Sequence, residues 1–148
     1  MRSARVHLMA ALLITLLLSI PAQAAGDFAL IDQHGYFHQL SRYGASRAVV
    51  MMVQRNADES SHAAAAILTA LRDRHREAPL TFLMLNADEG VTRADVLEAA
   101  VDFPVLLDAA QIVALSLGVT HVADVVVLDP RSQRVLYRGA LHEARRSR

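Results

Sequence analysis

The chain has no cysteine, no lysine and no tryptophan among its 148 residues. Without cysteine it can form no disulfide, no thiolate nucleophile and no lipid-modified N-terminal cysteine. Without lysine it has no Schiff-base chemistry. Its fifteen basic residues are therefore all arginines, and they balance fifteen acidic residues. No excess of one charge points to nucleic acid or to an anionic membrane as a partner.

Residues 1–24 have the pattern of an export signal. A basic start precedes an apolar run over residues 8–20, which Pro21 ends, and residues 22–24 have the small-x-small pattern read by signal peptidase. We expect cleavage after Ala24 and one domain over residues 25–148, periplasmic or secreted. No stable membrane anchor is expected after cleavage, and an uncleaved N-terminal anchor is the alternative.

The remaining chain alternates strand and helix patterns, with few glycines and prolines. A hairpin is predicted around the turn Asp32-Gln33-His34-Gly35, where glycine allows a positive φ. Four apolar runs predict strands of a single sheet, at residues 48–53, 80–85, 125–128 and 134–137. Helices are predicted at residues 59–76, 92–100 and 109–117. The pattern indicates an α/β fold, with a central mixed β-sheet flanked by helices and an N-terminal β-hairpin.

The first predicted helix is rich in alanine. Its inward face is predicted from apolar residues at helical spacing, namely Ala63, Ala66, Ile67, Ala70 and Leu71. The charged residues near its end are expected in solvent, namely Arg72, Asp73, Arg74 and Arg76. On the hairpin, His34 and His38 are expected to be exposed.

Three stretches, in this order and spacing, resemble a known family. They are DFALIDQHG at residues 27–35 with Leu40-Ser41, FPVLLD at 103–108, and LGVT at 117–120 followed by VVVLDP at 125–130 and YRG at 137–139. Together they are similar to the redoxins, which are thioredoxin-like proteins of the alkyl hydroperoxide reductase and thiol-specific antioxidant type. The resemblance covers nearly all of the expected mature chain, and it implies a thioredoxin-like fold with oxidoreductase or antioxidant activity.

The resemblance also shows what is missing. It places the family's reactive cysteine at Asp58, the second cysteine of some relatives at Ser61 and the residue of the cis-proline loop at Ala123. No catalytic residue of the family is retained, so its thiol-dependent reaction is excluded. Asp58 suits a helix N-terminus, because a carboxylate caps unpaired N–H groups and is favoured by the helix dipole.

Two other chemistries are conceivable near this position. Asp58, Glu59, His62 and His121 are candidate metal ligands, although first-turn acids are also what helix capping alone predicts. A nucleophilic triad from Ser60 or Ser61 with His62 and Asp124 lacks a nucleophile elbow. The core methionines Met51, Met52 and Met84 are expected to fill space rather than bind copper.

The sequence therefore favours a redoxin-like pseudoenzyme. Its expected role is to bind an exported protein or peptide, without catalysis or cofactor, in a groove between Asp58 and the loop at residues 122–124. The alternatives are an oxidoreductase or a metal-binding accessory protein with a non-thiol centre near Asp58 and His121, and a degenerate relative with no activity.

Overall fold

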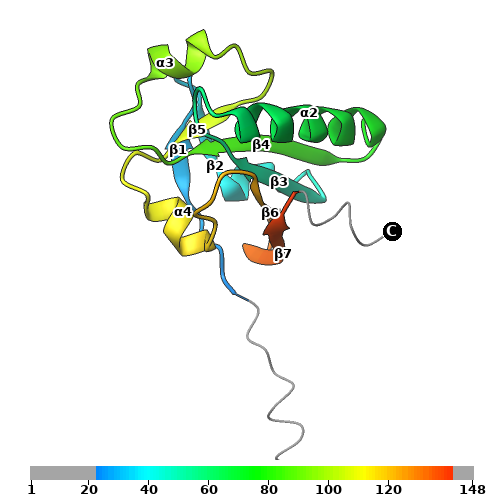
Figure 1. Ribbon diagram of the computed structural model, residues 1–148. Helices are drawn as coiled ribbons and strands as arrows, with labels where there is room; N and C mark the ends of the chain where they lie inside the picture. The colour runs from blue at the N-terminus through cyan, green and yellow to red at the C-terminus, as the bar shows by residue number, and fades with distance from the viewer. Residues whose placement is uncertain (1–22, 142–148) are drawn as a thin grey trace, which may run out of the picture.

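The centre of the fold is a five-stranded mixed sheet in the order β5-β4-β3-β6-β7 (Figure 1). The computed structural model describes residues 23–141, so nearly all of the expected export signal lies outside the described residues. The strands are β3 (Ala48–Val53), β4 (Leu80–Asn86), β5 (Val105–Leu107), β6 (Asp124–Asp129) and β7 (Arg134–Ala140). The four strands predicted from sequence share this sheet, which confirms the α/β fold.

β3 is the central strand because its sequence is apolar on both sides. All six of its residues are buried. β3 pairs in parallel with β4 and antiparallel with β6, so its backbone is bonded along both edges. A strand buried on both faces needs helices or other elements on each side of the sheet.

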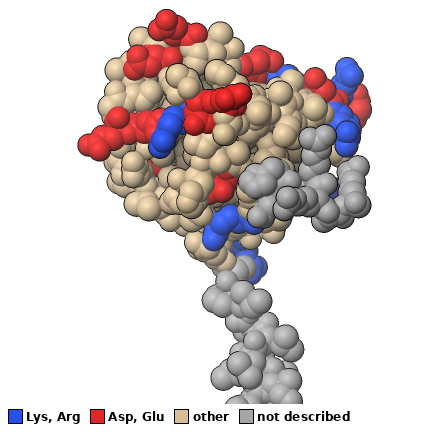
Figure 2. Space-filling view, in the orientation of Figure 1, with Lys and Arg blue, Asp and Glu red and all other residues tan. Residues whose placement is uncertain are grey.

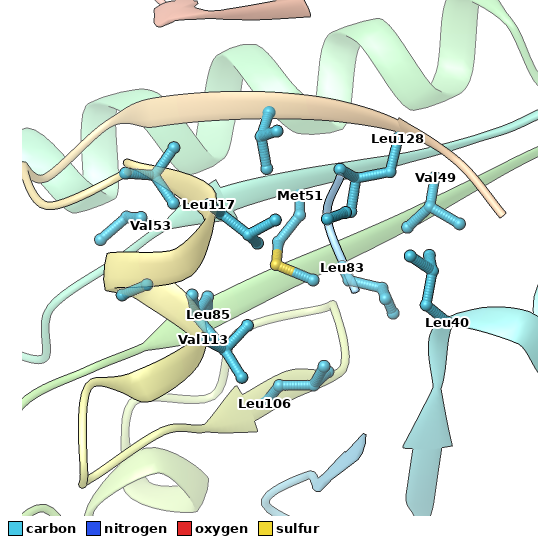
Figure 3. Packing of buried hydrophobic residues seen from close by; sticks show 14 residues of the cluster. Leu40, Val49, Met51, Val53, Leu83, Leu85, Leu106, Val113, Leu117 and Leu128 are labelled. Carbon is cyan, nitrogen blue, oxygen red and sulfur yellow. The ribbon is translucent and has the colours of Figure 1, made fainter. Parts of the chain in front are cut away.

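Two layers cover the two faces. On one face lie α2 (Glu59–Arg74) and α3 (Arg93–Glu98), which pack with Val50 and Met52. On the other lie α4 (Ile112–Leu117) and the 3-10 turn η1 (Leu40–Tyr43). In Figure 3, Met51 lies at the centre of this second layer, with Leu117 towards one end and Leu40 towards the other. Within residues 23–141 no helix has both the length and the apolar character to cross a membrane.

The inward face of α2 differs from the predicted one. The buried residues are Ser61, Ala64 and Leu68, while Ile67 is 41% exposed. The four consecutive alanines at residues 63–66 place an apolar side chain on every side of the helix. The spacing of apolar residues therefore could not show which side of α2 packs on the sheet. Contact with β3 and β4 selects it instead, and Leu68 is the large side chain that the sheet accepts.

The ends of the helices also differ in part from the sequence prediction. α2 ends at Arg74, where the His75 N–H donates to the Leu71 and Arg72 carbonyls. α3 begins close to its predicted start, with a capping box between Thr92 and Asp95. α4 begins at Ile112 rather than Ala109, because the Asp108 carboxylate is buried and accepts the Ala114 N–H at 2.8 Å. Gly118 ends α4 as predicted, with φ +67°.

The N-terminal hairpin forms a separate sheet from β1 (Ala29–Ile31) and β2 (Phe37–Gln39). The amide of buried Gln33 fastens its turn to the chain around β5. Gln33 Nε2 donates to the Phe103 carbonyl at 2.8 Å, and Gln33 Oε1 accepts the Val105 N–H at 2.7 Å. The sequence pattern predicted this hairpin but not its attachment.

The prediction that His38 is exposed was wrong, whereas His34 is exposed as predicted. The His38 side chain is only 11% exposed. It lies between the buried carboxylate of Asp32 and the hydroxyl of Tyr43, and both hydrogen-bond to its ring. This imidazole can be buried because each of its ring nitrogens has a hydrogen-bond partner. Neither partner is adjacent to His38 in sequence.

The packing of α2 can be tested with a pair of substitutions. Leu68→Ala should lower the free energy of unfolding by about 2–5 kcal/mol, because it leaves a cavity beneath the helix. The neighbouring change Ile67→Ala should stay within about 0.5 kcal/mol, as at other surface positions. Urea denaturation of both variants measures the difference. A larger loss for Ile67→Ala than for Leu68→Ala would show that the inward face is the one predicted from sequence.

Candidate functional site

Asp58 lies where the chain passes from the end of β3 into α2. It is the N-cap residue, with extended backbone at φ −99° and ψ 125°. Its Oδ1 accepts the Ser61 N–H at 2.9 Å. The carboxylate therefore satisfies one of the unpaired N–H groups of the first helical turn, as expected for an aspartate N-cap.

Ser61 faces inward from the same turn and is 2% exposed. Its Oγ accepts the Arg55 N–H at 2.7 Å, while its own N–H donates to Asp58. Ser61 thus connects the start of the loop to the helix cap. A buried hydroxyl held by a backbone N–H, with no imidazole bonded to it among the described residues, is not an activated nucleophile.

Side-chain amides lie beneath this loop, a feature that the sequence analysis missed. Gln54 follows β3 and Asn86 ends β4, and both are buried. Each donates to Oδ1 of Asn56, at 3.3 and 3.4 Å respectively. Asn56 Nδ2 is buried without a partner among the described residues. The available sequence signal was a polar residue directly after each of two buried parallel strands.

A second loop approaches the end of β3 from the other side. Ala123 has φ +67°, an unusual conformation for a residue with a Cβ. Its N–H donates to the Val53 carbonyl at 2.9 Å, and its carbonyl accepts the Leu141 N–H. Asp124 closes the preceding turn by accepting the N–H groups of Thr120 and His121. Backbone bonds, rather than a proline, position this loop.

A shallow groove lies between the two loops and α4. Its lining on the side of α4 is mixed. Apolar side chains come from Ala114, Leu115, Val119 and Val122, and polar ones from Gln111 and Thr120. Arg55 and Asp88 form its polar rim, with Arg55 Nε 2.7 Å from Asp88 Oδ1. Leu115 is 63% exposed although it is apolar. The groove therefore offers some exposed apolar surface at the end of β3.

Acidic residues are unevenly distributed along the chain. Between Glu77 and Pro130 the chain has nine acidic residues and a single arginine, Arg93. On the face seen in Figure 2, acidic side chains gather around the end of the molecule where α3 lies. The near-zero net charge therefore conceals a local excess of negative charge in this half of the chain.

Comparison with solved structures identifies the arrangement. Peroxidoxin BcpB from Mycobacterium tuberculosis is 21% identical, with a TM-score of 0.67 over 82% of this chain and 85% of that one. The exposed lipoprotein thioredoxin Etrx1 from Streptococcus pneumoniae is 15% identical, with a TM-score of 0.64 over 78% and 89%. The thioredoxin domain of a thiol-disulfide oxidoreductase from Bacteroides vulgatus is 14% identical, with a TM-score of 0.62 over 80% and 89%.

The fold is thioredoxin-like. These likenesses confirm the redoxin resemblance at the level of the fold. By sequence, the chain matches no protein-family profile and no curated protein. The thioredoxin-like architecture is thus retained in a chain without cysteine.

The thioredoxin-like fold does not gather the candidate metal ligands. Within residues 23–141, no three or more His, Asp or Glu side chains form a group that could hold a metal ion. His121 is 85% exposed, and its nearest carboxylate partner is Asp124 at 3.5 Å. Glu59 and His62 point to solvent. Asp58, Glu59, His62 and His121 therefore do not form a site together.

The imagined triad is not assembled either. The Ser61 hydroxyl accepts the Arg55 N–H, and the Asp124 carboxylate accepts the His121 N–H within its own turn. Ser60 and His62 are exposed. The residues that the fold does bring together at this end of β3 are the Asp58 cap, Ser61, the buried amides and the apolar groove.

The role of Asp58 as a cap can be tested by a matched pair. Asp58→Ala should reduce the free energy of unfolding by about 0.5–2 kcal/mol, because the Ser61 N–H loses its acceptor. Asp58→Asn should cost much less, since asparagine caps a helix nearly as well. Denaturant titration compares the two, with Ser60→Ala as an exposed control in the same turn. A loss in Asp58→Asn as large as in Asp58→Ala would assign the carboxylate's charge a further role.

Proposed function

We propose that this protein is a non-catalytic binding module that holds an extended peptide segment of another exported protein. The observation that carries the proposal is the pairing of a capped, unreactive helix start with an open apolar groove. Asp58 and Ser61 are bonded to backbone groups, whereas Leu115, which lines the groove together with Arg55, remains exposed. The thioredoxin-like scaffold would bind a peptide segment in this groove, and the groove has no thiol that could exchange electrons with a disulfide.

The chemistry of the groove suggests what it binds. Its wall of Ala114, Leu115, Val119 and Val122 suits an apolar side chain inserted from an extended peptide. On the rim, Arg55 and Asp88 pair with each other, and the residues that follow them closely in sequence, Asp58, Glu59 and Glu89, add acidic side chains. Basic residues flanking the apolar anchor would complement this charge, and the attraction would weaken as salt screens it.

Export belongs to the same proposal. It is supported by the signal pattern of residues 1–24, which lie almost wholly outside the described residues. Etrx1, one of the proteins with the same fold, is described as an exposed lipoprotein. Because this chain has no cysteine, it would be released after cleavage near Ala24, leaving the domain from residue 25 onwards free to meet its partner.

Binding can be measured by fluorescence anisotropy with labelled peptides carrying one large apolar residue between arginines. Affinity should fall with added salt, and an acidic-flanked version of the peptide should bind more weakly. Leu115→Arg should weaken binding at least about tenfold, which corresponds to about 1.4 kcal/mol. Leu136→Arg is the matched control, because Leu136 is equally apolar and 59% exposed but lies on β7.

The proposal fails if peptides of both kinds bind equally weakly. It also fails if Leu115→Arg and Leu136→Arg change affinity by the same amount, because binding would then not involve the groove. Circular dichroism spectra of both variants should match the parent, which separates lost binding from lost fold.

A further inference from the structure

Three polar side chains form a hydrogen-bonded row under the N-terminal hairpin, away from the groove. His38 lies in the middle, with Nε2 2.8 Å from Asp32 Oδ2 and Nδ1 hydrogen-bonded to the Tyr43 hydroxyl. The Asp32 carboxylate is 3% exposed, and His38 and Tyr43 are at least partly buried. Asp32 and His38 are on the hairpin, and Tyr43 ends η1 before β3, whereas Asp58 follows the far end of that strand.

The charge state of Asp32 determines which atoms donate in this row of hydrogen bonds. Burial raises the pKa of Asp32, but hydrogen bonds from His38 and from the N–H groups of Tyr36 and His34 outweigh it and keep the pKa below its usual value. Asp32 is therefore an ionised acceptor, and His38 Nε2 donates to it. In the neutral imidazole the other nitrogen, Nδ1, is an acceptor. In that neutral form the Tyr43 hydroxyl donates to a base whose other nitrogen is bonded to a carboxylate.

Tyr43 also remains a phenol. Burial, and then the negative charge of Asp32, raise the pKa of Tyr43. A phenol that keeps its proton loses an electron readily only when the proton can leave at the same time, because the phenol radical cation is a very strong acid. His38 Nδ1 is an acceptor already in hydrogen-bond contact with that proton.

No other side chain in the part of the molecule that the structure describes combines these properties. The chain lacks cysteine and tryptophan, and it has three tyrosines. Tyr36 is 70% exposed and Tyr137 is 45% exposed. Among the hydrogen bonds of residues 23–141, neither of those two hydroxyls has a side-chain base as partner. Tyr43 is thus the tyrosine with a built-in proton acceptor.

We propose that Tyr43 is a one-electron, one-proton donor site that reduces high-potential metal complexes, with His38 and Asp32 positioning and receiving the proton. The phenolic O–H bond breaks, its electron passes to the oxidised metal complex, and the metal is reduced by one unit. The proton moves to His38 Nδ1. A neutral tyrosyl radical and an imidazolium ion remain, and the imidazolium still donates to Asp32. This non-thiol redox site is independent of the peptide groove.

The test generates a ruthenium(III) tris-bipyridine oxidant by flash photolysis in the presence of the full-length protein. Tyrosyl radical is followed by transient absorption and by electron paramagnetic resonance of frozen samples. The parent protein should give a radical that forms more slowly in deuterium oxide, because proton transfer accompanies electron transfer. Tyr43→Phe should remove most of that signal, while the matched variants Tyr36→Phe and Tyr137→Phe should retain it.

His38→Gln separates the proton-accepting role from a structural one. A glutamine amide can still accept a hydrogen bond from Tyr43, but it is too weak a base to hold the proton. Radical formation at Tyr43 should therefore slow at least about tenfold in a variant whose circular dichroism matches the parent. If His38→Gln fails to fold, the Tyr43→Phe comparison and the isotope effect decide. Equal radical yields from the three single Tyr→Phe variants, or no isotope effect in the parent, would overturn the proposal.

Discussion

Two hydrogen bonds at Ser61 fix the passage from the central strand to the main helix: the Ser61 N–H donates to the Asp58 cap, and the Ser61 hydroxyl accepts the Arg55 N–H. β3 runs through the core and stops at Val53, and α2 must begin within a few residues to return across the sheet. A helix start exposes N–H groups that attract a negative charge. Asp58 supplies a carboxylate there, and Ser61 connects the cap back to Arg55. The helix is anchored, and the position has no reactive group.

A carboxylate and a thiolate are similar in this environment and different in reaction. Both are stabilised by the partial positive charge of a helix N-terminus. Only the thiolate can attack a disulfide sulfur or a peroxide oxygen. Replacing one by the other therefore removes the chemistry while keeping the electrostatic match that helps the fold. The features left at this end of the sheet are the groove lined by Leu115 and the loop that the backbone hydrogen bonds of Ala123 hold in place.

Sequence patterns predicted those parts of the structure that depend on neighbours along the chain. The apolar run of β3, the capping box at Thr92 and the stop at Gly118 each depend on local physics, and each appears in the structure. Asp58 was predicted as a cap for the same reason. The inward face of α2 was not predictable, because alanines on all sides left the choice to contacts with the sheet. The His38 row and the Gln33 attachment join residues to distant partners, and no periodic pattern records such pairs.

The central claim is that the position of Asp58, at the N-terminus of α2, suits a reactive anion, and that the carboxylate stands where the resemblance places a cysteine. The most direct measurement introduces Asp58→Cys into this cysteine-free chain and follows its rate of alkylation against pH. A single cysteine makes the signal unambiguous. The account predicts a reactive thiol whose pKa lies below the free value of about 8.5, lowered by the first turn of α2. A thiol that is unreactive, or that titrates at or above the free value, would contradict it.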